Sequence, residues 1–239
     1  MPTAQRATEP GVAGTGWARL SALAGAIFFA LIVICSTLRS GAPSATDSGE
    51  DILDYVTQHQ GELQLGAALF GLAMAAALLW LPALYRALRR AEGTDSGLAV
   101  AAVAGGAIAA ASGAMTALIQ GTVAVRAGDL SGASIRVWWT MWLLSIGAIL
   151  LGLLVSIGVT GIVSLQRHLF ARWFAVASVV LALLSVVGAF TLGYAGAGLQ
   201  TVAGIAVLLD SVWILLVSVF LWRDPALADT GRDRAELPG

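Results

Sequence analysis

Asp210 is the residue of this chain whose type and position could most directly do chemistry. It lies inside the apolar run 202–222, where a helix long enough to cross a bilayer would bury it. A carboxylate in the middle of such a helix opposes insertion by about 2.5–3.5 kcal/mol, so intramembrane acids are candidate functional residues. The chain has no Lys, and no Arg or His lies at a similar depth in the other apolar runs. An uncompensated carboxylate in apolar surroundings takes up a proton, so we expect a protonatable acid rather than half of an ion pair.

The residues around Asp210 predict a pocket near the middle of the membrane. Ala203 and Ala206 lie on one side of it along the helix, and the bulkier Trp213 lies one turn away on the other side. This pattern suits a pocket that opens outward and is closed by Trp213, whose indole N–H can donate to the carboxylate. Polar residues at the same depth on other spans complete the predicted pocket: Ser112, Thr116 and Ser145, with Ser185 also at this depth. The alternative is structural, a hydrogen bond from protonated Asp210 to Ser112, to Thr116 or to a backbone carbonyl.

Four further polar side chains lie near the predicted outer ends of the spans and could rim an outward mouth: Glu62, Gln64, Gln120 and Gln200. Solvated interface residues are the alternative for this set. No catalytic, nucleotide-binding or metal-ligand motif accompanies Asp210, and the sequence predicts no cofactor. The single Cys35 cannot form a disulfide within the chain, and its position in an apolar run favours packing.

The composition predicts that the helices carrying these residues are surrounded mainly by lipid. Hydrophobic residues make up 58% of the chain and charged residues 11%, against about 25% charged in a soluble domain. No basic stripe is present that would bind nucleic acid. Six apolar runs are long enough to span a bilayer, at 17–38, 63–84, 97–123, 137–163, 173–194 and 201–222. The sequence therefore predicts an all-α bundle of six transmembrane helices at 17–223, between disordered tails at 1–16 and 224–239.

The distribution of arginine predicts the orientation in the membrane. The loops after the second and fourth runs are basic, and the loop after the first run is acidic. Since cytoplasmic loops carry the excess of Arg and Lys, both termini are expected in the cytoplasm of a bacterial plasma-membrane protein. The loop arginines are expected to hold this topology and to bind anionic lipid headgroups. They are Arg86, Arg89, Arg90, Arg167 and Arg172.

The first loop is expected to contain a short amphipathic helix on the outer face. Its start is indicated by one of two capping pairs, Asp47 with Glu50 or Ser48 with Asp51. A broken apolar stripe follows and ends at Gly61. Such a helix shields the bundle as a lid or surface element; a mobile gate over a cavity is the alternative.

The third run carries small residues at every fourth position, namely Gly97, Ala101, Gly105, Ala109, Gly113, Ala117 and Gly121. Small residues on one face let helices approach closely in a membrane. We therefore expect this span to be central in the bundle, with homo-oligomerisation through the same face as the alternative.

Three local patterns carry a family resemblance. The second span ends in LPALYRALRR at 81–90, the next basic loop reads LQRHLFARW at 165–173, and the last span ends in LWR at 221–223. With the acidic first loop, the chain resembles a broad group of uncharacterised six-helix membrane proteins of actinobacteria. The resemblance implies six helices and a plasma-membrane location, and it implies no activity. Membrane-embedded terpene cyclases are similar in length, but their acid beside a Trp in an early span is missing here.

Three functions remain open from the sequence. The leading one is a non-enzymatic membrane protein that binds or transports a small or lipophilic ligand at a midplane pocket around Asp210. The second is an intramembrane enzyme that uses Asp210 as a general acid on an isoprenoid or lipid-like substrate. The third is a structural subunit that packs through the third span.

Overall fold

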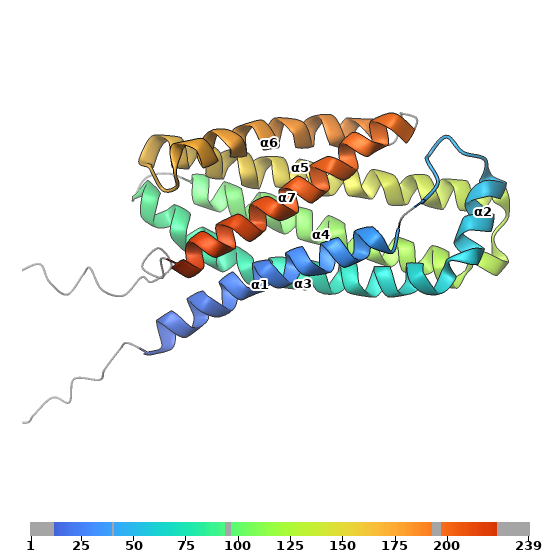
Figure 1. Cartoon of the computed structure of the whole chain (residues 1–239), viewed down its shortest axis with the longest axis horizontal. Coiled ribbons are helices and arrows are strands. Elements are labelled where there is room, and N and C mark those ends of the chain that lie inside the picture. Colours follow the sequence, from blue (N-terminus) through green and yellow to red (C-terminus); the bar gives the residue numbers. More distant parts are fainter. Residues whose placement is uncertain (1–11, 40, 94–96, 193–196, 224–239) are drawn as a thin grey trace, which may run out of the picture.

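The computed structural model of the chain is all-helical and describes residues 12–39, 41–93, 97–192 and 197–223. Six long helices form one bundle, and a short helix lies across one end of it (Figure 1). The helices are α1 (Val12–Thr37), α2 (Gly49–Gln58), α3 (Gln60–Glu92), α4 (Leu98–Val125), the 3₁₀ turn η1 (Ala127–Asp129), α5 (Gly132–Arg167), α6 (Arg172–Thr191) and α7 (Ala197–Arg223).

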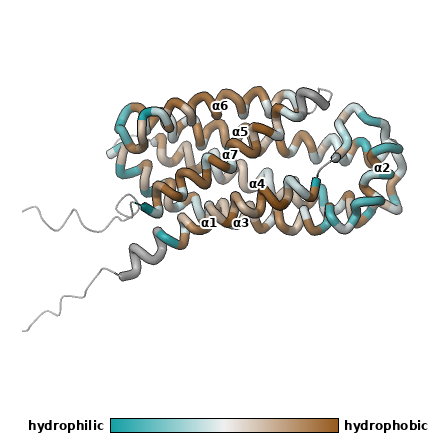
Figure 2. The backbone as a smooth tube through the Cα atoms, in the orientation of Figure 1, coloured by the Kyte–Doolittle hydropathy of each residue, from teal (hydrophilic) through white to brown (hydrophobic). Residues whose placement is uncertain are grey.

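Six of these helices are long and apolar enough to cross a membrane. Figure 2 shows hydrophobic residues along the length of the bundle and hydrophilic residues at its two ends. The predicted fold, six spans with a short helix between the first two, is confirmed. Helix α1 begins at Val12, inside the tail expected at 1–16; residues 1–11 and 224–239 lie outside the described chain.

The long helices form a closed ring in which each contacts its neighbours. Helices α3, α4, α5 and α6 pack side by side in chain order, α1 packs against α3 and α7, and α7 packs against α6. Helix α5 also contacts α3, α7 and the short α2. The end of α3, the start of α4 and the loop between α5 and α6 lie at the end opposite to α2 (Figure 1).

The prediction that the third span is central is wrong. That span is α4, which packs between α3 and α5, while its remaining face is exposed at Val100, Ile108 and Leu118 by 58–67%. The glycines and alanines do permit close packing, but large apolar residues lie between them on the face that points away from the bundle. Helix α5 is also a member of the ring, but it has more helix neighbours than α4, because it contacts α3, α7 and α2 as well as α4 and α6.

Close packing between α4 and α5 depends on two glycines that face each other. A Cβ atom added to Gly152 would lie 2.6 Å from the backbone N of Ala109 and 2.7 Å from the carbonyl O of Gly105. A Cβ added to Gly105 would likewise lie 2.7 Å from the carbonyl O of Gly152. Backbone atoms cannot move aside as side chains can, so only glycine fits this crossing. Gly105 of α4 is thus used for packing within the chain.

The short helix α2 begins where one of the two capping pairs predicted. The Ser48 side chain accepts a hydrogen bond from the Asp51 backbone N–H, which satisfies a donor at the helix start. The Asp47 carboxylate instead accepts from the Ser44 backbone N–H. Ile52 and Val56 are fully buried in a cluster of apolar residues from α3, α4 and α5, which holds α2 across the end of the bundle.

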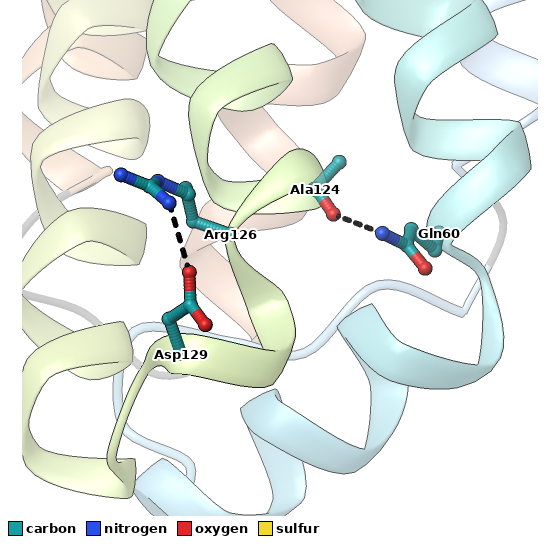
Figure 3. A network of polar contacts seen from close by, with 4 residues as sticks. All are labelled: Gln60, Ala124, Arg126 and Asp129. Carbon is teal, nitrogen blue, oxygen red and sulfur yellow. Dashed lines mark hydrogen bonds and ion pairs between the residues drawn. The ribbon is translucent and has the colours of Figure 1, made fainter.

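Polar contacts tie the chain together at the same end, as Figure 3 shows. The Gln60 side chain at the start of α3 donates to the Ala124 carbonyl near the end of α4, at 2.8 Å. Arg126 and Asp129 form an exposed ion pair across η1, with N and O atoms 3.0 Å apart. Exposed pairs of this kind contribute little, whereas the Gln60 bond satisfies a carbonyl that the helix leaves free.

Candidate functional site

Asp210 lies in the interface between α6 and α7 and is 1% exposed. Its carboxyl oxygens are 3.1 and 3.2 Å from the Ser185 hydroxyl oxygen, which is also 3.0 Å from the Leu181 carbonyl oxygen. Ser185 has one hydroxyl hydrogen, and the two acceptors compete for it if Asp210 is ionised. With a proton on Asp210, the acid donates to Ser185 and Ser185 donates to Leu181, so each group is satisfied. The geometry therefore suits a neutral acid that joins two helices.

Trp213 does not contact Asp210 through its indole N–H, contrary to expectation. The Nε1 atom donates to the Ser178 hydroxyl of α6, at 2.8 Å. The ring lies between Trp80 of α3 and Phe174 of α6, with centroids 6.1 and 6.2 Å away. Trp213 lies one turn further along α7, where these two rings and Ser178 already fill its surroundings.

The other predicted pocket residues form a separate network between α4 and α5. The hydroxyl oxygens of Thr116 and Ser145 are 2.8 Å apart, and each hydroxyl also lies within hydrogen-bond distance of a carbonyl of its own helix. For Thr116 that carbonyl belongs to Ser112. The structure therefore places Ser112, Thr116 and Ser145 in a different helix interface from Asp210, and Ser185 is the polar partner of the acid.

The residues predicted to rim an outer mouth do not surround one opening. Glu62 is exposed, and Gln64 lines a groove between α3 and α4. Gln120 is buried and donates to the Leu63 carbonyl at 2.8 Å, which joins α4 to α3. Gln200 belongs to α7, but its side chain falls outside the described part of the chain.

The arginines predicted to bind lipid headgroups lie at the end of the bundle opposite to α2. Arg89, Arg90, Arg167 and Arg172 are exposed, and Arg86 is half-buried. Arg89 already has an interaction within the chain. Their placement suits contact with a membrane surface.

A cavity of about 460 Å³ lies between α1, α3, α5 and α7. Its walls are mainly apolar and include Ile32 of α1, Met74 of α3 and Ile149 of α5. Two lining residues of α7, Ile205 and Leu208, are 49% and 40% exposed, so the cavity opens sideways between α1 and α7. In Figure 1 these two helices lie close together at the end opposite to α2 and separate toward α2. The opening therefore lies along the hydrophobic length of the bundle that Figure 2 shows.

Asp210 does not line this cavity, although Val207 and Ser211 beside it in the sequence do. The Asp210 carboxyl faces Ser185 of α6, whereas the cavity is lined by neighbouring positions of α7, among them Ala203 and Val207. Within the residues that the structure describes, no cluster of His, Cys, Asp and Glu could hold a metal ion.

Arg39 closes the cavity at its α2 end. Its guanidinium carbon lies 5.0 Å from the ring centroid of Phe70 and 5.2 Å from that of Trp142, and all three residues line the cavity. Cation–π attraction to the two rings holds the guanidinium in place. Burial lowers the pKa of Arg39 to about 10, so the group remains a cation at neutral pH.

Sequence reasoning missed Arg39 as a site residue, because an arginine directly after an apolar run resembles an ordinary interface anchor. One signal was present: it is a lone arginine in an otherwise acidic loop. The ring partners Phe70 and Trp142 come from α3 and α5, and no local pattern links them to Arg39.

Comparisons with protein-family models, with curated proteins and with solved structures find no match to this chain. The fold alone assigns the chain to a class of protein. It is a multi-pass membrane protein with six helices that could span a bilayer. The candidate site is an apolar cavity that opens between α1 and α7 and has the Arg39 cation at its α2 end.

Proposed function

We propose that this protein binds a lipophilic ligand in the cavity between α1, α3, α5 and α7. The observation that carries the proposal is the cavity itself, whose volume of about 460 Å³ lies in the range of about 300–1,000 Å³ typical of ligand sites. Its walls are mainly apolar, as a lipophilic ligand requires. The opening between α1 and α7 supports uptake of the ligand from the membrane rather than from water.

The dimensions of the cavity suit an elongated ligand. Along α5, the lining residues run from Trp142 to Leu153. At about 1.5 Å per residue, this stretch of helix is roughly 16 Å long. A hydrocarbon chain lying parallel to α5 therefore finds apolar contacts along its length.

The proposed ligand site does not include Asp210. A general acid must reach its substrate, and Asp210 instead faces Ser185 across a packed helix interface. The geometry therefore favours binding, or transport that includes binding, over an intramembrane enzyme that uses this acid.

We infer from the charge distribution that the α2 end lies outside the cell. Acidic residues gather on α2 and at the start of α3, while the basic loops lie at the opposite end. The resemblance to actinobacterial six-helix proteins supports a bacterial plasma-membrane location with both termini in the cytoplasm. In this orientation the cavity opens into the outer leaflet.

Filling the opening with Gly204→Phe tests the proposed function. Gly204 lines the cavity, and a Cβ atom added there meets no atom within 4 Å, so the variant is expected to fold. Native mass spectrometry of protein purified in mild detergent should show lipophilic adducts on the wild type and at least tenfold fewer on Gly204→Phe.

Val212→Phe is the matched control, because Val212 is an exposed residue of α7 outside the cavity lining. It should retain the adducts of the wild type. Equal adduct levels on all three proteins would show that the lipophiles bind to the outer surface, and the proposed function would then be wrong.

A further inference from the structure

The α2 end of the cavity, which Arg39 closes, contains buried hydrogen-bond donors that have no partner among the described residues. They are Nε and Nη2 of Arg39 and Nε1 of Trp142, and the Tyr55 hydroxyl nearby is in the same situation. Buried polar groups in proteins are nearly always hydrogen-bonded, and unpaired ones mark sites where a partner is missing. A charged donor left unpaired is the most unfavourable kind.

Arg39 also lacks a counter-ion within the part of the chain that the structure describes. The ion pair between Arg126 and Asp129 does not involve it. Three acidic residues at the α2 end, Asp47, Asp51 and Asp54, line a separate surface hollow. This hollow and the cavity share Ala42 and Pro43 as lining residues, so these two residues lie between them.

The Tyr55 hydroxyl is protonated, so it is a hydrogen-bond donor and not a phenolate anion. Burial raises its pKa, and the Glu62 carboxylate adds to this effect, so the phenol keeps its proton at neutral pH. Arg39 and Tyr55 are close enough for each to influence the pKa of the other. Tyr55 lines the acidic hollow and not the cavity, so the donors that can face a ligand in the cavity are those of Arg39 and Trp142, which include a single full positive charge.

A single anionic headgroup in the cavity would satisfy the unpaired donors of Arg39 and Trp142 together. The Nε and Nη2 atoms form one edge of the guanidinium plane, which can donate two parallel hydrogen bonds to a carboxylate or phosphate. Such bonds are stronger than those between neutral groups, particularly where water is excluded. Directly below the headgroup, the apolar cavity offers space for a chain.

We propose that the ligand is a single-chain amphiphile with a carboxylate or phosphate headgroup, held by Arg39 and Trp142 with its chain along α5. This inference rests on the proposed function, since it names the class of ligand that the cavity binds. The ligand reaches the cavity from the membrane between α1 and α7. The carboxylates of Asp47, Asp51 and Asp54 would repel an anion that approached from water on the other side.

The test uses three probes with the same chain: palmitate, hexadecyl phosphate and hexadecan-1-ol. Each is added in equal amount to the purified protein, and bound adducts are counted by native mass spectrometry. The wild type should bind at least one of the two anionic probes at least tenfold better than the alcohol, which corresponds to about 1.4 kcal/mol. The probe that binds better distinguishes a fatty acid from a phosphate ester as the ligand.

Two variants test which residues cause the preference for an anionic probe over the alcohol. Arg39→Gln should bind the preferred anion no better than the alcohol, and Trp142→Phe should reduce the preference less, because it keeps an aromatic ring beside Arg39 and removes the indole N–H. Equal binding of all three probes by the wild type, with loss of all of them in Gly204→Phe, would overturn this inference and leave the proposed function intact. Failure of all three probes to bind, or binding unaffected by Gly204→Phe, would overturn both.

Discussion

Replacing Gly152 by Ala is expected to lower the free energy of unfolding by about 1–3 kcal/mol, the usual range for overpacking a filled interior. The added methyl group would lie 2.6 Å from the backbone N of Ala109 and 2.7 Å from the carbonyl O of Gly105. Neither atom belongs to a flexible side chain, so α4 and α5 must separate. The loss should appear in unfolding by denaturing detergent and as a lower melting temperature.

Gly158→Ala is the matched control for this prediction. Gly158 lies on the same helix, and a Cβ atom added there meets Ala182 Cβ at 3.4 Å, an ordinary contact distance. Since Ala favours helix over Gly by about 0.5–1 kcal/mol, this variant should be as stable as the wild type or slightly more stable. Equal losses in the two variants would mean that the α4–α5 crossing does not require glycine at 152.

Replacing Ser185 by Ala is expected to destabilise the protein by about 1–3 kcal/mol, because it leaves Asp210 buried without its hydrogen-bond partner. Asp210→Asn should be neutral or stabilising. The Asn side-chain amide can donate to Ser185 while Ser185 donates to the Leu181 carbonyl, so the bonds of the neutral acid are preserved. Unfolding of the purified variants measures both effects.

The double variant Ser185→Ala with Asp210→Leu separates a structural acid from a functional one. If Asp210 serves only to join α6 and α7, removing both polar groups should recover much of the stability that Ser185→Ala loses. Adduct levels in native mass spectra should then match those of the wild type. Loss of the adducts in a stable Asp210→Asn variant would instead return the acid to the ligand site.

The spans and the short helix were predictable because they depend on local properties of the sequence. Hydropathy over about twenty residues sets each span, and the Ser48–Asp51 pair sets the start of α2. Both features depend only on residues that are close together in the sequence. They required no knowledge of which helices are neighbours.

The cavity was not predictable, because it depends on how the helices are rotated and paired. Arg39, Phe70 and Trp142 come from three separate parts of the chain and meet only in the folded bundle. The same limit explains Asp210: its depth indicated Ser185 among several polar candidates, but only the packing of α6 against α7 selects it. Depth in the membrane can be read from sequence, whereas the direction of a side chain cannot.

The central claim is that a lipophilic chain occupies the cavity alongside α5. It is tested most directly by photo-cross-linking with a palmitate analogue that carries a diazirine at the end of its chain. After irradiation in lipid nanodiscs and digestion, the label should map to the lining residues Met74, Ile149 and Leu153, and excess unmodified palmitate should remove it. Label found only on lipid-facing residues such as Leu118 and Leu183, unaffected by competition, would contradict the account.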